Sequence, residues 1–543
     1  MTRNPSEHLR LYNGWKGRRA TLEAGWQENA YYCLPRRSFI TRYHNIGDRL
    51  PDDLFDSTAP NSVDYAAAGI QGYLTNPATR WFKLMLKDRR MMEMAGAKAY
   101  LRDCEDAIYD ALNGSNFYQE DTEGYRNLLV IATDVLYEDE DIETDIRFLS
   151  VPIENCVIVP NASGRIRTVY IMFEYTADQA VEKFGQAKMS KELMEAYTNL
   201  NFDKKWQFLY CVYQRPVFDA SKKDKKNMPF ASEWIDVKAL TSVKEGGYNE
   251  FPFMISRWAK ASGDDPYGVC PTDREISNIK TLNAMCATNL IAGEKMSDPP
   301  LDIPDEAFMR PLDFQAGGLN MRNTGYAGEK INQIYASGNV PFALEYEDAR
   351  RRMIQQAYFN DLFIVLNQRI DATAEEIRAR VAERMLLLGP AIGMIVTDKL
   401  RPAVERTYNI LYRLRKLPPT PPGLQGQQFI VVATSPLAQA QKAVEMQGLN
   451  MAMNIVAQLM QIQPEIIDKV KCDDVLDFAA DITNLNPKLI RDDAEVAEIR
   501  SNRAAANAMA QQMQMMEQGA NTVKTASEAD RNLATAGAGK GMA

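Results

Sequence analysis

The residues of this sequence with the greatest potential for chemistry are the acidic side chains of one short run. Its sequence is Tyr137-Glu138-Asp139-Glu140-Asp141-Ile142-Glu143. Carboxylates are the ligands that calcium and magnesium ions prefer, so the run could hold a divalent cation. It lacks the alternating Asp or Asn residues and the central Gly of a calcium-binding loop. Since runs of like charge usually face water, we favour a solvated acidic turn over a metal site.

A glycine-containing segment at residues 263–268, Gly-Asp-Asp-Pro-Tyr-Gly, is a second candidate. A phosphate-binding loop requires a Lys and then a Ser or Thr after its last Gly, and neither follows here in register. The segment is better interpreted as a turn before a helix that begins at Pro271. The two histidines, His8 and His44, are not spaced as metal ligands, and we interpret them as surface or helix-end residues. The sequence therefore predicts a protein that is not an enzyme, with no metal site and no cofactor.

Size, charge and cysteine content narrow the class of protein. The chain has 543 residues and a formal net charge of -9, whereas a protein that grips DNA over its whole surface normally has net positive charge. Any DNA contact must therefore be local or loose. Seven scattered cysteines without a CxxC pair favour reduced thiols in a cytosolic setting. The longest apolar run, Met385 to Val396, is too short to span a bilayer, so we expect no membrane contact.

The first half of the chain changes from helical to strand periodicity. Apolar spacing predicts a small-residue helix over 61–75, capped by Ser57 or Thr58, with Trp81 and Phe82 entering a core after it. A second helix over 97–112 is expected to end at Asn113-Gly114 in a left-handed conformation. A β-rich insert follows at about 146–260. Its expected strands are 146–149, 157–160, 165–172, 206–213, 232–237 and 248–258, with the basic run Lys222 to Lys226 in a loop.

The second half returns to helical patterns. Two helices, 271–297 and 341–360, flank a segment rich in Gly, Pro and Asn, and residues 361–371 then interrupt helicity. A long helix is expected from Thr373 to about Arg415, bent at Pro390 and Pro402 because proline removes a backbone hydrogen bond. Then come a strand at 429–433, a helical C-terminal region and a Gly/Ala-rich tail. The Met-rich run 508–516 fits either a partner-binding helix or packing inside an oligomer.

Four stretches, taken together, resemble one protein family. They are the Asp-Ser-Thr-Ala opener at 56–59 with its closing Pro77-Ala78-Thr79-Arg80-Trp81-Phe82, the segment 265–271 with Ile276, Lys280, Leu282 and Asn283, the segment 371–377, and the segment 432–441. In this order and spacing they resemble the portal, or head-to-tail connector, proteins of short-tailed bacteriophages. The resemblance covers about residues 55 to 441, which is most of the chain.

The resemblance implies an α+β, mainly helical portal fold with wing, stem, clip and crown, assembled as a ring around a central channel. The implied parts are a wing at 1–265, stem helices at 266–297 and 341–360, a clip at 298–340, a tunnel loop at 361–371, a long kinked wing helix with its following strand at 372–435, a helical crown at 436–529 and a disordered tail at 530–543.

The implied role is that of a conduit for DNA packaging and exit at one capsid vertex of the virion, after assembly in the host cytoplasm. The implied partners are further copies in a dodecamer, the terminase large subunit, tail adaptor and tail tube proteins, major capsid and scaffolding proteins, and double-stranded DNA bound without sequence specificity. The expected channel constriction is Phe363, Ile364, Val365 and Leu366, and the expected DNA contacts are Asn367, Gln368 and Arg369. Alternatives are a tail adaptor or internal core protein, or a metal-dependent enzyme using residues 138–143 and 264–265.

Overall fold

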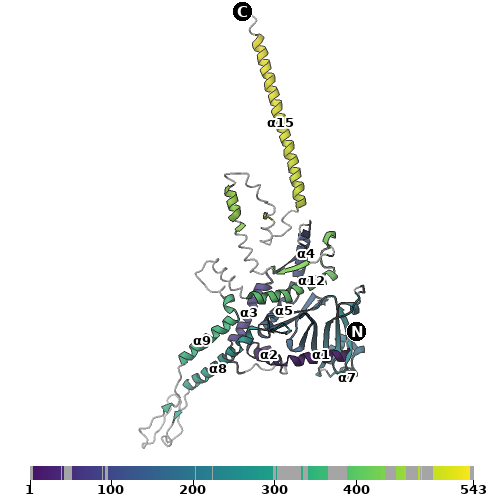
Figure 1. Cartoon of the computed structure of the whole chain (residues 1–543), viewed down its shortest axis with the longest axis vertical. Coiled ribbons are helices and arrows are strands. Elements are labelled where there is room, and N and C mark those ends of the chain that lie inside the picture. Colours follow the sequence, from purple (N-terminus) through teal and green to yellow (C-terminus); the bar gives the residue numbers. More distant parts are fainter. Residues whose placement is uncertain are drawn as a thin grey trace. The chain divides into compact units, whose positions relative to one another are not determined.

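The computed structural model of the chain forms two compact units (Figure 1). The first comprises Met1–Phe82, Ala107–Lys416 and Ala433–Ala440, and the second comprises Lys83–Asp106, Leu417–Val432 and Gln441–Ala543. The structure describes residues 4–37, 39–41, 52–88, 90–91, 94, 96–201, 203–219, 221–222, 224–263, 265–297, 301–302, 332–333, 340–364, 388–424, 426, 429–433, 448–449, 451–459, 475–476, 479 and 493–538.

Helix α3, Thr58–Leu74, confirms the predicted small-residue helix. Its predicted inward positions, Val63, Ala67, Ile70 and Leu74, are all buried. The alanines allow close packing, and α3 contacts α2 (Ala20–Cys33), α5 (Phe117–Val130) and α9 (Val340–Ala357). Ser57 is the N-cap residue, as predicted, but its side chain makes no cap hydrogen bond. The Asp56 carboxylate instead accepts a hydrogen bond from the Thr58 N–H at 2.8 Å.

The predicted burial of Trp81 and Phe82 is confirmed. The Phe82 ring stacks on Tyr109 at 4.3 Å between centroids, and the Phe82 N–H donates to the Tyr109 hydroxyl at 2.8 Å. Trp81 stacks on Phe117 at 5.9 Å. Tyr109 belongs to α4, Ala97–Gly114, which confirms the second helix. Gly114 does not have the expected left-handed backbone, since it is still the last helical residue and its φ is not positive.

A five-stranded antiparallel sheet confirms the predicted β-rich insert. Its strands in order are β4 (Cys156–Pro160), β5 (Ile166–Tyr175), β6 (Trp206–Gln214), β7 (Phe230–Asp236) and β8 (Thr241–Tyr248). The turn between β4 and β5 contains Gly164 at φ 73°. Because side chains alternate along a strand, Leu209, Cys211 and Tyr213 share one face while Trp206 and Phe208 share the other.

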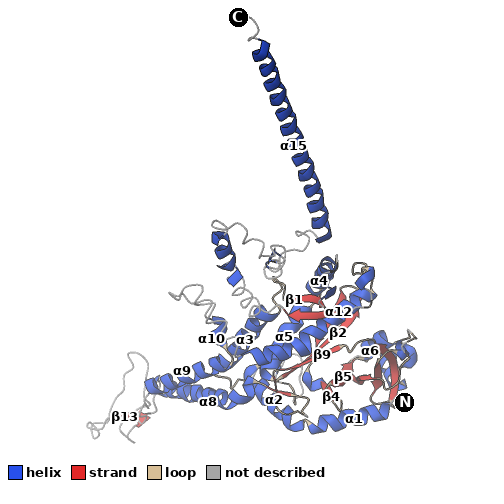
Figure 2. Ribbon diagram, turned by 45° about the horizontal axis from the view of Figure 1, so that its top comes forward, coloured by secondary structure: helices blue, strands red, loops and turns tan. Residues whose placement is uncertain are grey.

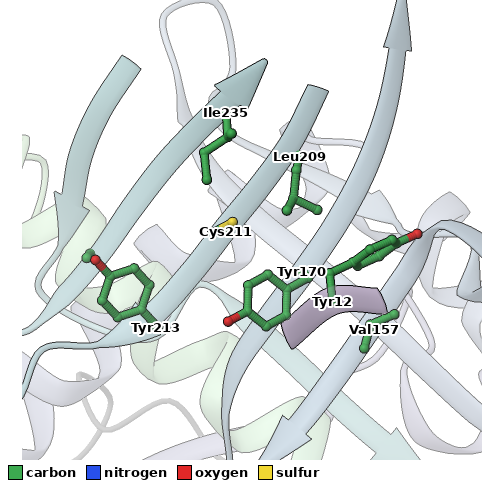
Figure 3. Close-up of a cluster of buried hydrophobic side chains, with 8 residues drawn as sticks. Tyr12, Val157, Tyr170, Leu209, Cys211, Tyr213 and Ile235 are labelled. Atoms are coloured by element: carbon green, nitrogen blue, oxygen red, sulfur yellow. The ribbon is translucent and has the colours of Figure 1, made fainter. Parts of the chain in front are cut away.

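Helices cover both faces of this sheet. Helix α1 (Pro5–Arg18) places Tyr12 against Val157, Tyr170 and Leu209 on one face (Figure 3). Helices α6 (Ala177–Phe184) and α7 (Lys191–Thr198) pack on the other face. Of the two interpretations of His8, the helix-end position is confirmed and the surface exposure is wrong. His8 lies in α1 and is fully buried, 3.3 Å from the Tyr170 hydroxyl and 3.7 Å from a Glu233 carboxylate oxygen.

The acidic run is the end of a strand, and the expected solvated turn is limited to its last residues, since 142–144 form an exposed turn. Residues Thr133–Asp141 are strand β2, the centre of a three-stranded antiparallel sheet. Its neighbours are β3 (Asp145–Ser150) and β9 (Phe253–Arg257). Glu138 is fully buried. Its carboxylate accepts a hydrogen bond from the Thr407 hydroxyl at 2.8 Å and lies 4.0 Å from the Arg406 guanidinium, and these contacts stabilise it in the core. Glu138 is the one buried residue of this run, since the other six residues keep partial or full exposure, so the prediction fails at the run's first carboxylate.

The predicted bend near Pro402 is a turn of π-helix. Residues 388–395 are helical, the π-helix η7 spans Val396–Leu400, and helix α12 spans Arg401–Arg413. A proline ring clashes with the carbonyl four residues earlier, here that of Asp398, which favours a wider turn at this point. The expected start of this helix at Thr373 lies outside the described residues.

The π-helix carries Lys399 into the core of the first unit. The Lys399 ammonium lies 2.8 Å from an Asp121 oxygen on α5 and 2.7 Å from an Asp134 oxygen on β2, and all three side chains are fully buried. Burial disfavours the charged lysine, but the two carboxylates outweigh this effect and raise its pKa to about 12. Gly124 leaves the space for this triad, since a Cβ there would collide with Asp134 and Lys399.

Apart from the end residues Phe82 and Ala433, the small sheet of β1 (Phe82–Leu86) and β14 (Phe429–Ala433) belongs to the second unit, and β14 confirms the predicted strand. Glu105 of α4 accepts a hydrogen bond from the Leu84 N–H at 2.7 Å. Helix α15, Asp493–Ala538, is continuous (Figure 1). The expected disordered tail is therefore wrong for residues 530–538, which are helical.

Replacing Lys399 by Met leaves two buried carboxylates without their cation. We expect the free energy of unfolding to fall by roughly 3–5 kcal/mol, because an unpaired buried charge is strongly destabilising. Urea unfolding compared with Lys416→Met tests this, since Lys416 makes a largely exposed ion pair with Asp145 at 2.6 Å and its loss costs at most about 1 kcal/mol. Equal losses in the two variants would contradict the role assigned to the triad.

The buried Glu138 makes stability depend on pH. Burial raises its pKa from 4.5 to about 8, although Arg406 and Thr407 act in the opposite direction. The folded protein thus holds a proton that the unfolded chain releases, so stability falls as pH rises between these two values. We expect Glu138→Gln to lose less stability than the wild type between pH 5 and pH 8.5, by on the order of 3 kcal/mol. Thermal melts at both pH values check this, with the exposed Glu140→Gln as the variant that should follow the wild type.

Candidate functional site: the two-helix arm

Two long helices extend together from the first unit and form what we call the arm, α8 (Pro271–Ser297) and α9 (Val340–Ala357) (Figure 2). They lie side by side and confirm the helices predicted at these positions. Helix α8 begins at Pro271, where the missing proline N–H costs nothing. The Asp273 carboxylate accepts a hydrogen bond from the Cys270 N–H at 2.9 Å, which closes this helix start.

The base of the arm is fixed by a buried chain of hydrogen bonds. The Thr272 hydroxyl donates to the Leu129 carbonyl of α5 at 2.8 Å and accepts from the Tyr358 hydroxyl at 2.6 Å. The Cys33 thiol of α2 lies 3.5 Å from the same tyrosine oxygen and donates to it, since a hydroxyl has only one proton. Burial raises the pKa of Tyr358 well above its usual value and that of Cys33 to about 11. The arm therefore starts from a rigid, neutral anchor.

A polar seam joins the two helices along their length. The Arg350 guanidinium donates to the Asn278 side-chain oxygen at 2.7 Å, and the Asn289 amide donates to Glu347. Arg351 contacts Glu347 at 3.0 Å and also the sulfur of Cys286 at 3.4 Å. Burial alone would lower the pKa of Arg351, but the carboxylates around it raise it above its usual value. Directional bonds thus hold the arm together beside its buried apolar residues Ile279, Leu282 and Ile354.

The opening residues of the small-residue helix bind the same seam. The Asp56 carboxylate that caps α3 also accepts a bond from the Arg351 guanidinium at 3.1 Å. Asn283 of α8 accepts from the Phe55 N–H at 2.7 Å and donates to the Asp53 carbonyl at 2.9 Å. Three of the residues singled out by the resemblance, Asp56, Thr58 and Asn283, therefore meet at one junction between α3 and the arm.

Several large apolar side chains of the arm have no cover within the first unit. They are at least 47% exposed, far more than such residues are in a packed core. Helix α8 contributes Leu290, Ile291 and Met296, and helix α9 contributes Leu344 and Met353. Apolar side chains concentrated on one projecting element indicate a surface that another protein covers.

The chain reverses after the arm at Phe359, whose φ is 60°. Helix α10, Asn360–Ile364, follows, so the expected loss of helicity at 361–371 is wrong for 361–364. Phe363 and Ile364 belong to this helix. Val365, Leu366, Asn367, Gln368 and Arg369 lie outside the described residues, as does the expected clip apart from residues 301–302 and 332–333. These two short strands pair antiparallel as β12 and β13.

The structure gives a packing or surface role to residues of two other segments considered from the sequence, the segment 263–268 and the basic loop. Gly268 lies in β11 (Gly268–Val269), and a Cβ there would be 2.6 Å from the Ala132 carbonyl, so this glycine permits close backbone packing. Lys226 of the basic loop pairs with Glu245 at the surface, 3.3 Å apart. Within the described ranges, no group of three or more acidic, His or Cys side chains is placed to hold a metal ion. In the same ranges no helix has the length and apolar character that a membrane span requires.

The arm projects from a body of mixed helices and strands, and comparison with known proteins gives the class of the whole chain. Residues 6–490 match the family of bacteriophage head to tail connecting proteins, and the chain belongs to this family. It is 27% identical over 522 residues to the portal protein of Salmonella phage epsilon15, covering 94% of this chain and 93% of the relative. It is 28% identical over 528 residues to the probable portal protein of Bordetella phage BPP-1, covering 95% of each. The resemblance to portal proteins is confirmed, and neither description names an enzymatic activity.

The junction at Arg351 predicts how the arm responds to substitution. Arg351→Met removes the cation that Asp56 and the buried Glu347 share, so the arm should open more often. We expect amide hydrogen exchange in α8 and α9 to accelerate about tenfold, which corresponds to ~1.4 kcal/mol. Arg352→Met, at an exposed position on the same helix, is the matched control. Unchanged exchange in the Arg351 variant would show that the seam does not hold the arm.

Proposed function

We propose that the chain assembles into a closed, dodecameric ring around a central channel at one vertex of a phage capsid. The observation that carries this proposal is the exposed apolar side chains of an arm whose base is rigid. A closed ring covers such surfaces on every copy, because each copy presents one face to each neighbour. Family membership supports the same conclusion, since a connector between head and tail surrounds the path of the DNA.

We assign the parts of the ring from the element order. The arm helices α8 and α9 are the stem, and residues 298–340 between them are the clip. The body up to residue 265, with the long helix that ends in α12, is the wing. Residues 361–371 form the tunnel loop, and α15 belongs to the crown. The order of two paired helices, a return through α10 and a kinked long helix supports this assignment.

The ring acts as the conduit for genome packaging and exit in the virion. The clip is the docking surface for the terminase large subunit and for tail adaptor and tail tube proteins, and the wing meets capsid and scaffolding proteins. The ring is assembled in the host cytoplasm. A chain with a formal net charge of -9 suits a channel through which DNA slides, because broad positive lining would retain phosphates.

Replacing one exposed arm residue by a charge tests ring formation. Leu290→Asp should shift the protein from ring to smaller species in sedimentation velocity, because a buried unpaired charge would recur at every contact between neighbours, at roughly 1–3 kcal/mol each. Val217→Asp changes a valine that is even more exposed than Leu290, in the connection between β6 and β7, and should leave the ring intact. Rings formed equally by both variants would contradict the use of this arm surface.

The tunnel loop predicts a separate phenotype. We propose that Arg369 contacts DNA phosphates, once per copy, without sequence preference. Arg369→Glu should leave the ring intact but reduce the protected genome in nuclease-treated heads. Full-length protected DNA at wild-type yield would contradict this assignment of the loop.

A further inference from the structure

Helix α15 has an apolar stripe of heptad period, in which Asn502 is the one polar residue at an a or d position between Ile499 and Val523. The residues Ile499, Ala506, Met509, Met513, Met516 and Val523 are separated by seven, three, four, three and seven positions. These separations place them at the a and d positions of one unbroken heptad register, the period of helices that pack along each other. Met509, Met513, Met516 and Val523 are each at least 69% exposed. The stripe therefore has no cover from its own chain at these positions.

The charges beside the stripe select the orientation of the partner helix. Glu498 precedes the a position at Ile499 and is a g residue, and Arg503 follows the next d position and is an e residue. In a parallel, in-register pair, a g residue lies beside the e residue five positions later on the other helix. Glu498 of one copy then meets Arg503 of the next. An antiparallel pair would instead place g beside g and e beside e, which loses this match.

Small residues widen the stripe on both sides. Ala505 and Ala526 occupy g positions and Ala510 occupies an e position. Alanine at these positions lets helices approach on either flank of the a and d residues, so that one helix can contact two others. A ring gives each copy two neighbours related by the same rotation, with all helices pointing the same way.

We propose that α15 packs in parallel and in register against α15 of both neighbouring copies through the stripe Ile499 to Val523, with Glu498 of each copy paired to Arg503 of the next. The partner is thus a second copy of this chain, and not another virion protein. This inference rests on the proposed ring and adds a contact between neighbours outside the arm.

Cysteine cross-linking of the full-length ring tests the stripe. Met516→Cys places a thiol at a d position, and Met515→Cys places one at the adjacent c position, which is equally exposed in the single chain. Because packing holds paired thiols at a high effective concentration, oxidation should give roughly tenfold more cross-linked dimer for Met516→Cys than for Met515→Cys. The wild type, whose Cys286 is the one cysteine of the described residues that is not buried, gives the background.

Charge exchange tests the orientation. Glu498→Arg and Arg503→Glu should each reduce the cross-linking yield of Met516→Cys, and the double exchange should restore it. Rings in electron micrographs with equal cross-linking at positions 515 and 516 would overturn the inference and leave the proposed ring standing. If the double exchange does not restore the cross-linking yield, the parallel pairing is overturned. Absence of rings in every variant and in the wild type would overturn the proposed ring and this inference together.

Discussion

The buried contact of Lys399 with Asp121 and Asp134 is the interaction on which the rest of the first unit depends. Three fully buried charges are tolerated only with close geometry and further hydrogen bonds. Thr75 donates to Asp121 at 2.6 Å, and Asn127 and Ser150 approach Asp134 at 3.4 Å. The triad joins α5 and β2, which follow each other in the sequence, to the π-helix, which is far from both. It therefore fixes where the long helix crosses the body.

The position of the long helix at Lys399 determines contacts made by the residues before and after it in the chain. On one side, α12 follows at once and places Thr407 against Glu138. On the other side, Leu388 packs with Leu362, Trp258 and Phe359 next to the reversal after the arm. Helix α5, which supplies Asp121, also supplies the Leu129 carbonyl that receives Thr272 at the base of the arm. One rigid path thus runs from the buried lysine to the base of the surface that we assign to ring contacts.

The sequence predicted the elements whose pattern is local. Helix α8 begins at Pro271 and the turn before β5 uses Gly164, and both features are visible in a few residues. It failed where a distant partner decides the outcome. The buried state of Glu138 depends on Thr407 and Arg406, and that of His8 depends on Tyr170 and Glu233. A carboxylate run and a lone histidine carry no local sign of such partners, so their usual exposed states were expected instead.

The same limit applies to the candidate site. The two arm helices could be predicted, but their polar seam could not, because Arg351 and Asp56 are brought together only by the fold. The resemblance marked Asp56 and Asn283 without a reason, and the junction between α3 and the arm supplies one. The residues expected to contact DNA, Asn367, Gln368 and Arg369, remain predictions.

Electron microscopy of the purified, full-length protein, with classification of single-particle views along the particle axis, tests ring formation most directly. We expect closed rings of identical copies with an axial opening wide enough for duplex DNA. Particles that are monomers, or open assemblies without an axial opening, at the concentrations where the protein is stable and folded would contradict this expectation.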